Sequence, residues 1–468
     1  MLEALKRYLV PGGAVLLILI FLSGCGSMAT RKDFYDPITV ELRARNYQAA
    51  AAGLEEARAK GKFGEKDRFV YYVDAGLAYN YAGYHDSSNL RLHEAEIAAE
   101  DLFTKSISKA AVSLLLNDNA LDYAGEDYEI LYTNLLSSLN YIALGKFDDA
   151  FVEIRRANLK LELLEQKYAE AVQMFQRGAE EDTVEVQVNY DIKPVRFHNS
   201  AFGRYLSMHM YAADGKMDDA QIDFDYLKQA FSAQPFIYDF DFPELKYRAD
   251  EGALLSVVAL AGLAPVKEAL NLRIRTDKQL DLVQVLYTDP DRQDQEYGHL
   301  PMKVSEDYYF KFAIPTLQDR PSAISHANVY AGSELLGRLQ LLEDVGKVAR
   351  ETFESKSSLI YIRSVVRAVA KGLLAHKQKK NVDSGGLGGW LKKAAIDVVT
   401  DVSENADLRC SRLLPGRILV GDFELPPGEY DLMVEFVGYD GSIVDRQMFP
   451  QYRVLDDGLN MIQAVSLN

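Results

Sequence analysis

A short motif that recurs along this chain constrains its fold more than any other feature. Gly145-Lys146-Phe147-Asp148-Asp149-Ala150 returns as Gly215-Lys216-Met217-Asp218-Asp219-Ala220, with a looser copy at Gly83 and a weaker one at Arg45. A tyrosine precedes each of the three glycines by four residues; these are Tyr79, Tyr141 and Tyr211. Glycine adopts the left-handed conformation that ends a helix, and acidic residues favour the start of the next one. The motif therefore predicts helical hairpins whose turns contain these glycines.

The spacing of this motif resembles that of the tetratricopeptide repeat at the turn between its paired helices. We expect the small residues Ala150 and Ala220 to let the two helices approach closely, with the tyrosines packed in the seam between them. Residues 127–144 and 148–176 have apolar side chains at helical spacing on either side of one turn. Such a pair cannot bury its apolar face alone, so neighbouring pairs must stack. The pattern therefore predicts a tetratricopeptide-like α-solenoid.

Towards the C-terminus the apolar residues change to a period of two, which is typical of strands. The strands are expected at residues 417–421, 430–436, 447–454 and 459–465. Turn sequences such as Pro426-Pro427-Gly428 separate them. Four or five short strands predict a small β-sandwich or open sheet.

The middle of the chain is expected to be mixed. Residues 251–274 have the pattern of another helical hairpin, and residues 333–379 that of long helices, with short strands at 283–287 and 308–314. The predicted fold class is α+β, mainly α. The predicted segments are a signal peptide (1–24), a tetratricopeptide-like hairpin array (25–274), a mixed segment with short strands and then long helices (275–383), a glycine-rich breaker with a short helix (384–400), and a C-terminal β-module (401–468).

The first residues predict export and a lipid anchor. Lys6 and Arg7 precede an apolar run, residues 14–22, which is shorter than the roughly 20 residues that a membrane-spanning helix needs. The run ends in Leu22-Ser23-Gly24-Cys25, which resembles the lipobox of bacterial lipoproteins. The resemblance implies cleavage before Cys25 and its lipidation, and Gly26 in place of aspartate favours the outer membrane. The alternative is an uncleaved anchor helix.

Most of the mature chain resembles a family of Gram-negative lipoproteins with a tetratricopeptide-like body and a small C-terminal β-domain. The matching segments are 127–158, 205–220, 363–368, the glycine-rich breaker and 406–415. Cys410 stands where an aromatic residue is more usual in that family. The resemblance implies a lipid-anchored protein of the outer membrane that faces the periplasm, and it implies no established activity.

The residues that carry chemistry form no catalytic motif. The chain has no Gly-x-Ser-x-Gly turn, no Walker loop and no His-Glu-x-x-His helix, and its seven histidines are scattered. A net charge of −17 disfavours a nucleic-acid partner. We therefore expect neither an enzyme nor a cofactor, and no metal site. The alternative is a module that binds or hydrolyses peptidoglycan or another polysaccharide, because a carboxylate pair can serve such chemistry.

We expect the protein to bind another cell-envelope protein. Stacked helical pairs form concave grooves, and tyrosine is enriched at protein interfaces. The candidate contact residues are Tyr71, Tyr72, Tyr81, Tyr84, Arg155, Arg156, Asn158, Arg363, Arg367 and Lys371. For the tyrosines, the alternative is packing between helices. For the basic stretch 363–393, the alternatives are a solvated stripe, docking on the protein's own acidic repeats, or contact with an anionic envelope partner such as lipid head groups or cell-wall polymer.

Overall fold

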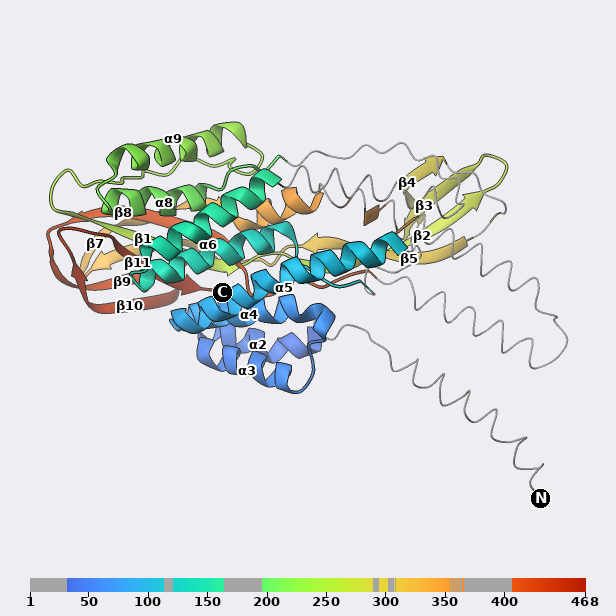
Figure 1. Cartoon of the computed structure of the whole chain (residues 1–468), viewed down its shortest axis with the longest axis horizontal. Helices are drawn as coiled ribbons and strands as arrows, with labels where there is room; N and C mark the ends of the chain where they lie inside the picture. The colour runs from blue at the N-terminus through green and yellow to red at the C-terminus, as the bar shows by residue number, and fades with distance from the viewer. Residues whose placement is uncertain are drawn as a thin grey trace, which may run out of the picture.

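The computed structural model describes residues 32–112, 121–163, 196–288, 294–301, 309–354 and 406–468, with short pieces at 307, 357, 360–361 and 364–365. Helices make up its N-terminal half, and two β-sheets follow (Figure 1). The expected α+β fold class is therefore confirmed. Within these residues, no helix combines the length and the apolar character that crossing a membrane requires.

The helices form successive hairpins that pack against one another. They are α2 (Lys32–Arg43), α3 (Tyr47–Ala59), α4 (Arg68–Tyr81), α5 (His85–Val112), α6 (Asp127–Ala143), an unlabelled helix over residues 147–163, α8 (Ala201–Ala213) and α9 (Met217–Ala233). The pairs α2–α3, α4–α5, α6 with the 147–163 helix, and α8–α9 are each joined by a tight turn.

The hairpin turns have the predicted geometry. Gly83, Gly145 and Gly215 have positive φ angles of 76°, 69° and 72°. The residue after each glycine donates its amide to the carbonyl of the preceding tyrosine, for example at 2.9 Å from Tyr84 to Tyr79. These bonds form the left-handed helix end in which the tyrosine carbonyl accepts from a residue five positions later. Ala150 and Ala220 are fully buried, as expected at the close approach of two helices.

The larger sheet has seven strands and lies against the helices. They are β1 (Ala253–Leu263), β6 (Ile324–Ala331), β7 (Glu334–Asp344), β8 (Pro415–Leu425), β9 (Gly428–Gly438), β10 (Ile443–Val454) and β11 (Asn460–Ser466), in the order β10-β9-β6-β7-β8-β1-β11. One face of the sheet forms a core of its own that includes Val257 and Phe436. The other face, with Val258 and Ile418, belongs to the core of the helices.

The smaller sheet extends from the end of β1 and lies on the right in Figure 1. Its strands are β2 (Val266–Asp277), β3 (Leu282–Thr288), β4 (Asp294–Pro301) and β5 (Tyr309–Gln318), in the order β4-β3-β2-β5. All its neighbouring strands are antiparallel. The strands predicted at 283–287 and 308–314 are confirmed as parts of β3 and β5.

Two predicted helical segments are wrong. Residues 251–274 form β1 and most of β2, because β1 is buried on both faces and therefore lacks the alternation that marks a strand. Residues 334–344 form β7, and the helix begins only at Val345. That helix is described without interruption to Glu354, and most of the remainder of the predicted 333–379 helices lies outside the described residues.

The predicted C-terminal strands are confirmed as β8 to β11, but they do not form a separate small sheet. β8 pairs with β1 and β7, β9 pairs with β6, and β11 pairs with β1 in parallel. The reason is long-range pairing: strands whose paired residues lie between 73 and 205 positions apart complete one sheet. The glycine-rich breaker at 384–400 and the signal peptide lie outside the described residues.

Candidate functional site

Buried ionisable groups concentrate around residues 406–414, which we call the strap. The strap precedes β8 and has no regular secondary structure. Arg409, Cys410 and Ser411 within it are at most 2% exposed. Buried backbone and hydroxyl groups outside regular structure need hydrogen-bond partners. Carboxylates from α4 and α6 supply them.

Asp74 of α4 holds the strap from one side. Its carboxylate accepts hydrogen bonds from the Ser411 hydroxyl (2.6 Å), the Arg412 amide (3.1 Å) and the Tyr35 hydroxyl of α2 (2.6 Å). Burial raises the pKa of Asp74 to about 6, although these hydrogen bonds favour the charged form. One carboxylate therefore joins α2, α4 and the strap.

Glu129 of α6 holds the same strap residue from the other side. Its carboxylate accepts hydrogen bonds from the Ser411 amide (2.5 Å), the Tyr123 hydroxyl (2.7 Å) and the Glu126 amide (2.7 Å). The bond from Glu126 belongs to a capping box at the start of α6. Burial raises the pKa of Glu129 to about 7, and the positive charge of Lys267 opposes this shift. Ser411 thus bridges the carboxylates of two helices.

Two buried cations of this junction, Arg409 in the strap and Lys267 next to it, form ion pairs. Arg409 contacts Asp67 at 2.8 Å and Asp407 at 2.7 Å. Lys267 of β2 forms an ion pair with Glu126, and both side chains are at most 4% exposed. Removing one partner of such a buried pair leaves an uncompensated buried charge and is strongly destabilising. These contacts are therefore those of a structural junction between helices, strap and β2.

Cys410 lies in the middle of this junction. Its sulfur accepts the amide of Lys267 at 3.4 Å, and the residue is fully buried. Burial raises the pKa of the Cys410 thiol, which disfavours the thiolate that a nucleophile requires. The thiol therefore acts as a packed side chain at this position.

A second junction centres on Glu343 of β7. Its carboxylate accepts hydrogen bonds from the hydroxyls of Tyr132 (2.6 Å), Tyr238 (2.8 Å) and Ser200 (2.9 Å). The amide of Phe202, in the first turn of α8, also donates to it at 3.1 Å. Burial raises the pKa of Glu343. This carboxylate joins the larger sheet to α6 and to the start of α8.

Ser256, His209 and Asp422 lie together and are the residue types of a hydrolase triad. His209 Nε2 lies 3.1 Å from Asp422, and Ser256 Oγ lies 3.2 Å from His209 Nδ1 and 3.4 Å from Nε2. An oxygen almost equally far from both ring nitrogens is not aligned for proton transfer to one of them. The three side chains are at most 3% exposed, so a substrate has no access. Tyr205 also donates to Asp422, at 2.8 Å, and the group docks α8 on the sheet.

The candidate tyrosines do not form one surface. Tyr71 and Tyr81 are 2% and 6% exposed, and their hydroxyls donate to Glu55 and to the carbonyl of Leu413, each at 2.6 Å. Tyr72 is half-buried, whereas Tyr84 is 45% exposed. Packing between elements of the chain accounts for Tyr71 and Tyr81, and Tyr84 alone of the four is well exposed.

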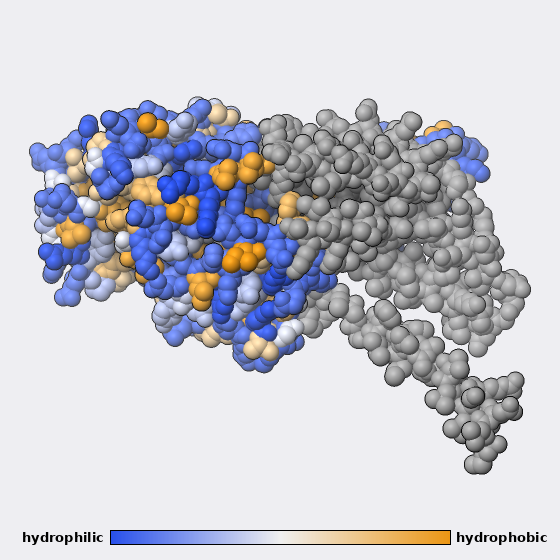
Figure 2. Space-filling model, in the orientation of Figure 1, coloured by the Kyte–Doolittle hydropathy of each residue, from blue (hydrophilic) through white to orange (hydrophobic). Residues whose placement is uncertain are grey.

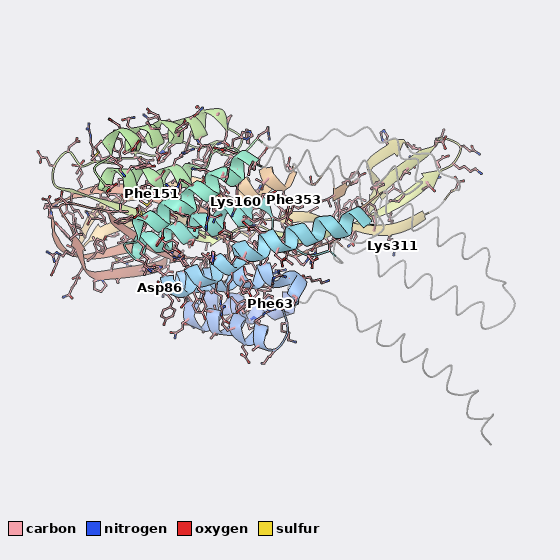
Figure 3. All side chains as sticks on the ribbon, in the orientation of Figure 1. Phe63, Asp86, Phe151, Lys160, Lys311 and Phe353 are labelled. Carbon is pink, nitrogen blue, oxygen red and sulfur yellow. The ribbon has the colours of Figure 1, made fainter. Side chains whose placement is uncertain are left out.

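The candidates on the 147–163 helix differ from one another. Arg156 forms ion pairs with Glu96 of α5 at 2.9 Å and with Glu153 at 3.0 Å. Arg155 is exposed, and Asn158 is half-buried. Lys160, which is labelled in Figure 3, also pairs with Glu96, at 2.6 Å. Arg156 therefore has a role within the chain, whereas Arg155 is directed to solvent. Cys25, Arg363, Arg367 and Lys371 lie outside the described residues.

An aromatic loop at residues 236–247, which the sequence patterns above do not predict, packs on α9. Its rings pack on α9: Tyr238 and Phe242 lie 4.6 Å and 5.0 Å from the ring of Phe231, and Tyr247 lies 5.6 Å from that of Phe224. The sequence signal is an aromatic residue at every second position from 236 to 242. The loop therefore covers α9, the last helix of the described hairpins.

Across the described residues, no group of three or more His, Cys, Asp or Glu side chains is placed to hold a metal ion. Comparison of the chain with protein-family models, curated proteins and solved structures found no match.

Proposed function

We propose that this protein is a lipid-anchored scaffold of the bacterial cell envelope, which faces the periplasm from the outer membrane and binds another envelope protein through its helices. The anchor rests on the lipobox that ends at Cys25. Anchoring confines a bound partner near the membrane and raises its effective concentration. Control of cell-wall synthesis and assembly of an envelope secretion machine are the processes that such a scaffold fits.

The exposed apolar residues of the outer helices carry this proposal. Almost all of α4 and α6 is buried, whereas α5, the 147–163 helix and α9 each keep one face in solvent. The large apolar side chains exposed on them are Leu90, Ile97, Phe103, Phe147, Leu159, Leu163, Met217, Ile222 and Tyr226. Leu159 and Leu163, and likewise Ile222 and Tyr226, are four residues apart and share a helix face. Hydrophobic residues lie among hydrophilic ones over these helices in Figure 2.

We further propose that the hairpins are a tetratricopeptide-like array whose inner face is occupied by the chain's own sheet. Three hydrogen bonds support this arrangement. Tyr132 of α6 donates to Glu343 and Tyr205 of α8 donates to Asp422, both in the sheet, and Tyr81 of α4 donates to the Leu413 carbonyl of the strap that leads into β8. The concave groove that stacked repeats usually offer to a partner is then filled. Partner binding falls to the outer helices and to the turns between helices.

We propose no catalytic step. The buried carboxylates of Asp74, Glu129 and Glu343 accept hydrogen bonds from the chain itself. Binding or hydrolysis of peptidoglycan or another polysaccharide is therefore the alternative that an incubation with cell wall tests. Full-length protein incubated with purified cell wall should neither co-sediment with it nor release fragments. Release of fragments would favour the hydrolase and would overturn the scaffold.

The anchor and the binding surface can be tested in cells. Cys25→Ala should abolish palmitate labelling, and labelling that persists would contradict the anchor. A photo-crosslinking amino acid at Ile97, Leu159 or Ile222 should attach one protein partner. The same probe at Tyr439, which is 75% exposed on the β9–β10 turn, is the control. Absence of cross-links at all the helical positions would overturn the scaffold proposal.

A further inference from the structure

Three of the hairpin turns lie side by side along one edge of the molecule. Lys146 forms an ion pair with Asp86 at 3.1 Å, which joins the turn after α6 to the start of α5. The rings of Phe151 and Tyr211 are 4.6 Å apart, which joins the start of the 147–163 helix to the end of α8. Asp86 and Phe151 are both labelled at the left end of their helices in Figure 3. We call residues 84–86, 145–149 and 214–219 the turn edge.

The turn edge exposes apolar side chains next to pairs of aspartates. Phe147 and Met217, 38% and 43% exposed, occupy the same position in two successive turns, and Tyr84 of the third turn is 45% exposed. Two exposed aspartates follow each of the first two residues; they are Asp148, Asp149, Asp218 and Asp219. The position of these aspartates at helix starts explains their negative charge, since a helix N-terminus favours negative charge. It does not account for an exposed apolar residue beside each pair.

The turn edge carries a net negative charge. It contains six aspartates and two lysines, a net charge of −4. Both lysines already have partners, Lys146 with Asp86 and Lys216 with Asp214 at 2.6 Å. In the part of the chain that the structure describes, no cation forms an ion pair with the four aspartates that follow Phe147 and Met217. These carboxylates are therefore available to a cationic partner.

We propose that the turn edge binds a basic amphipathic helix of the partner protein. Lysine or arginine side chains of that helix pair with Asp148, Asp149, Asp218 and Asp219, and its apolar residues cover Tyr84, Phe147 and Met217. Packed helices lie about 8–10 Å apart, and seven residues of α-helix rise about 10 Å. Basic residues seven positions apart therefore match successive turns. Anionic lipid, nucleic acid and acidic polymer are repelled by this charge.

This inference rests on the scaffold proposal, which places the protein in the cell envelope. It adds the surface that binds the partner and the chemistry of the partner segment. The probe for a direct test is a fluorescent 21-residue leucine/lysine helix with lysines seven positions apart, titrated into full-length protein in a neutral detergent. We expect saturable binding that weakens as salt is added, because exposed charge pairs are screened. The matching leucine/glutamate helix should not bind. Failure of the lysine peptide to bind would overturn the proposal.

A matched pair of variants separates the turn edge from the general charge of the protein. Neutralising the four turn-edge aspartates, as Asp148→Asn, Asp149→Asn, Asp218→Asn and Asp219→Asn, should weaken binding at least tenfold. The aspartates lie in the first turn of their helices, where negative charge is favourable, so circular dichroism and Tm are measured to show that the hairpins of this variant remain folded. The control neutralises four other exposed acids, as Asp250→Asn, Glu251→Gln, Asp456→Asn and Asp457→Asn. Equal loss in both variants would show non-specific attraction and overturn the proposal.

A photo-crosslinker at Met217 distinguishes failure of this inference from failure of the scaffold proposal. Attachment of a protein at Met217 that the four turn-edge substitutions abolish would support the inference. Attachment at Ile97 or Leu159 with none at Met217 would overturn the inference and leave the scaffold intact. Absence of attachment at every position would overturn both.

Discussion

Arg45 donates a hydrogen bond to the carboxylate of Asp445, although 400 positions separate the two residues in the chain. Arg45 also donates to the Arg446 carbonyl at 3.1 Å, and the Tyr47 hydroxyl donates to the Val465 carbonyl at 3.2 Å. The turn between α2 and α3 therefore contacts both β10 and β11. These are the two edge strands of the seven-stranded sheet, so the first hairpin links the edges that the sheet itself leaves unpaired.

Arg45 occupies the position that glycine holds in the other turns and has a φ angle of 63°. Arg45→Gly should relieve roughly 1 kcal/mol of left-handed strain but leave the carboxylate of Asp445 buried without its cation, which costs roughly 3 kcal/mol. We expect a net loss of about 2 kcal/mol in the free energy of unfolding by urea. Adding Asp445→Asn should recover at least half of this loss. Simple additivity of the two substitutions would contradict the coupling.

The hairpin glycines give a second prediction. Gly145→Ala and Gly215→Ala should each lower the free energy of unfolding by about 1 kcal/mol, because a Cβ in the left-handed region is strained. An added Cβ meets no atom within 4 Å at either site, so the loss has a purely backbone origin. Gly53→Ala, inside α3, is the matched control and should be stabilising by about 0.5–1 kcal/mol. Equal effects at all three sites would argue against the turn geometry.

The buried carboxyls of the strap junction predict a dependence of stability on pH. Burial raises the pKa of Asp74 to about 6 and that of Glu129 to about 7, from 3.8 and 4.5. Between the pKa of each carboxyl in the unfolded chain and its higher pKa in the folded chain, the folded chain binds more protons than the unfolded chain. These two groups therefore add stability as the pH falls from 7.5 to 5.5. Glu129→Gln should reduce this gain by roughly 1–2 kcal/mol in urea titrations at the two pH values. Glu251→Gln, at an exposed site, should leave the pH dependence unchanged.

Glu343 gives a fourth prediction. Glu343→Ala removes the acceptor of three hydroxyls and one amide and should lower the free energy of unfolding by about 3 kcal/mol or more. Glu334→Ala, at the exposed start of the same strand, should change it by less than about 0.5 kcal/mol. Thermal unfolding followed by circular dichroism measures both. A small effect of Glu343→Ala would mean that the helices are held to β7 by apolar contacts alone.

The turns were predictable because they depend on neighbouring residues. Gly145 must adopt a positive φ angle and Lys146 must reach the Tyr141 carbonyl, and both conditions lie within six residues. The strands β8 to β11 were equally accessible, since each shows its alternation and its turns locally. Strand β1 could not be predicted from the sequence, because Val257 faces the core of the sheet and Val258 faces the core of the helices. An apolar run without alternation does not distinguish a doubly buried strand from a buried helix.

The hydrogen-bond partners of the tyrosines and of the strap could not be predicted from local sequence patterns. The hairpin turns and the strand periodicity follow from adjacent residues and could therefore be predicted from the sequence. The hydrogen bond from Tyr81 to the Leu413 carbonyl, and those from Ser411 to Asp74 and Glu129, are visible only in the folded chain. These partners lie more than 280 positions apart. A buried carboxylate must be satisfied by whichever donors the folded chain brings to it, and that choice depends on how sheets and helices pack.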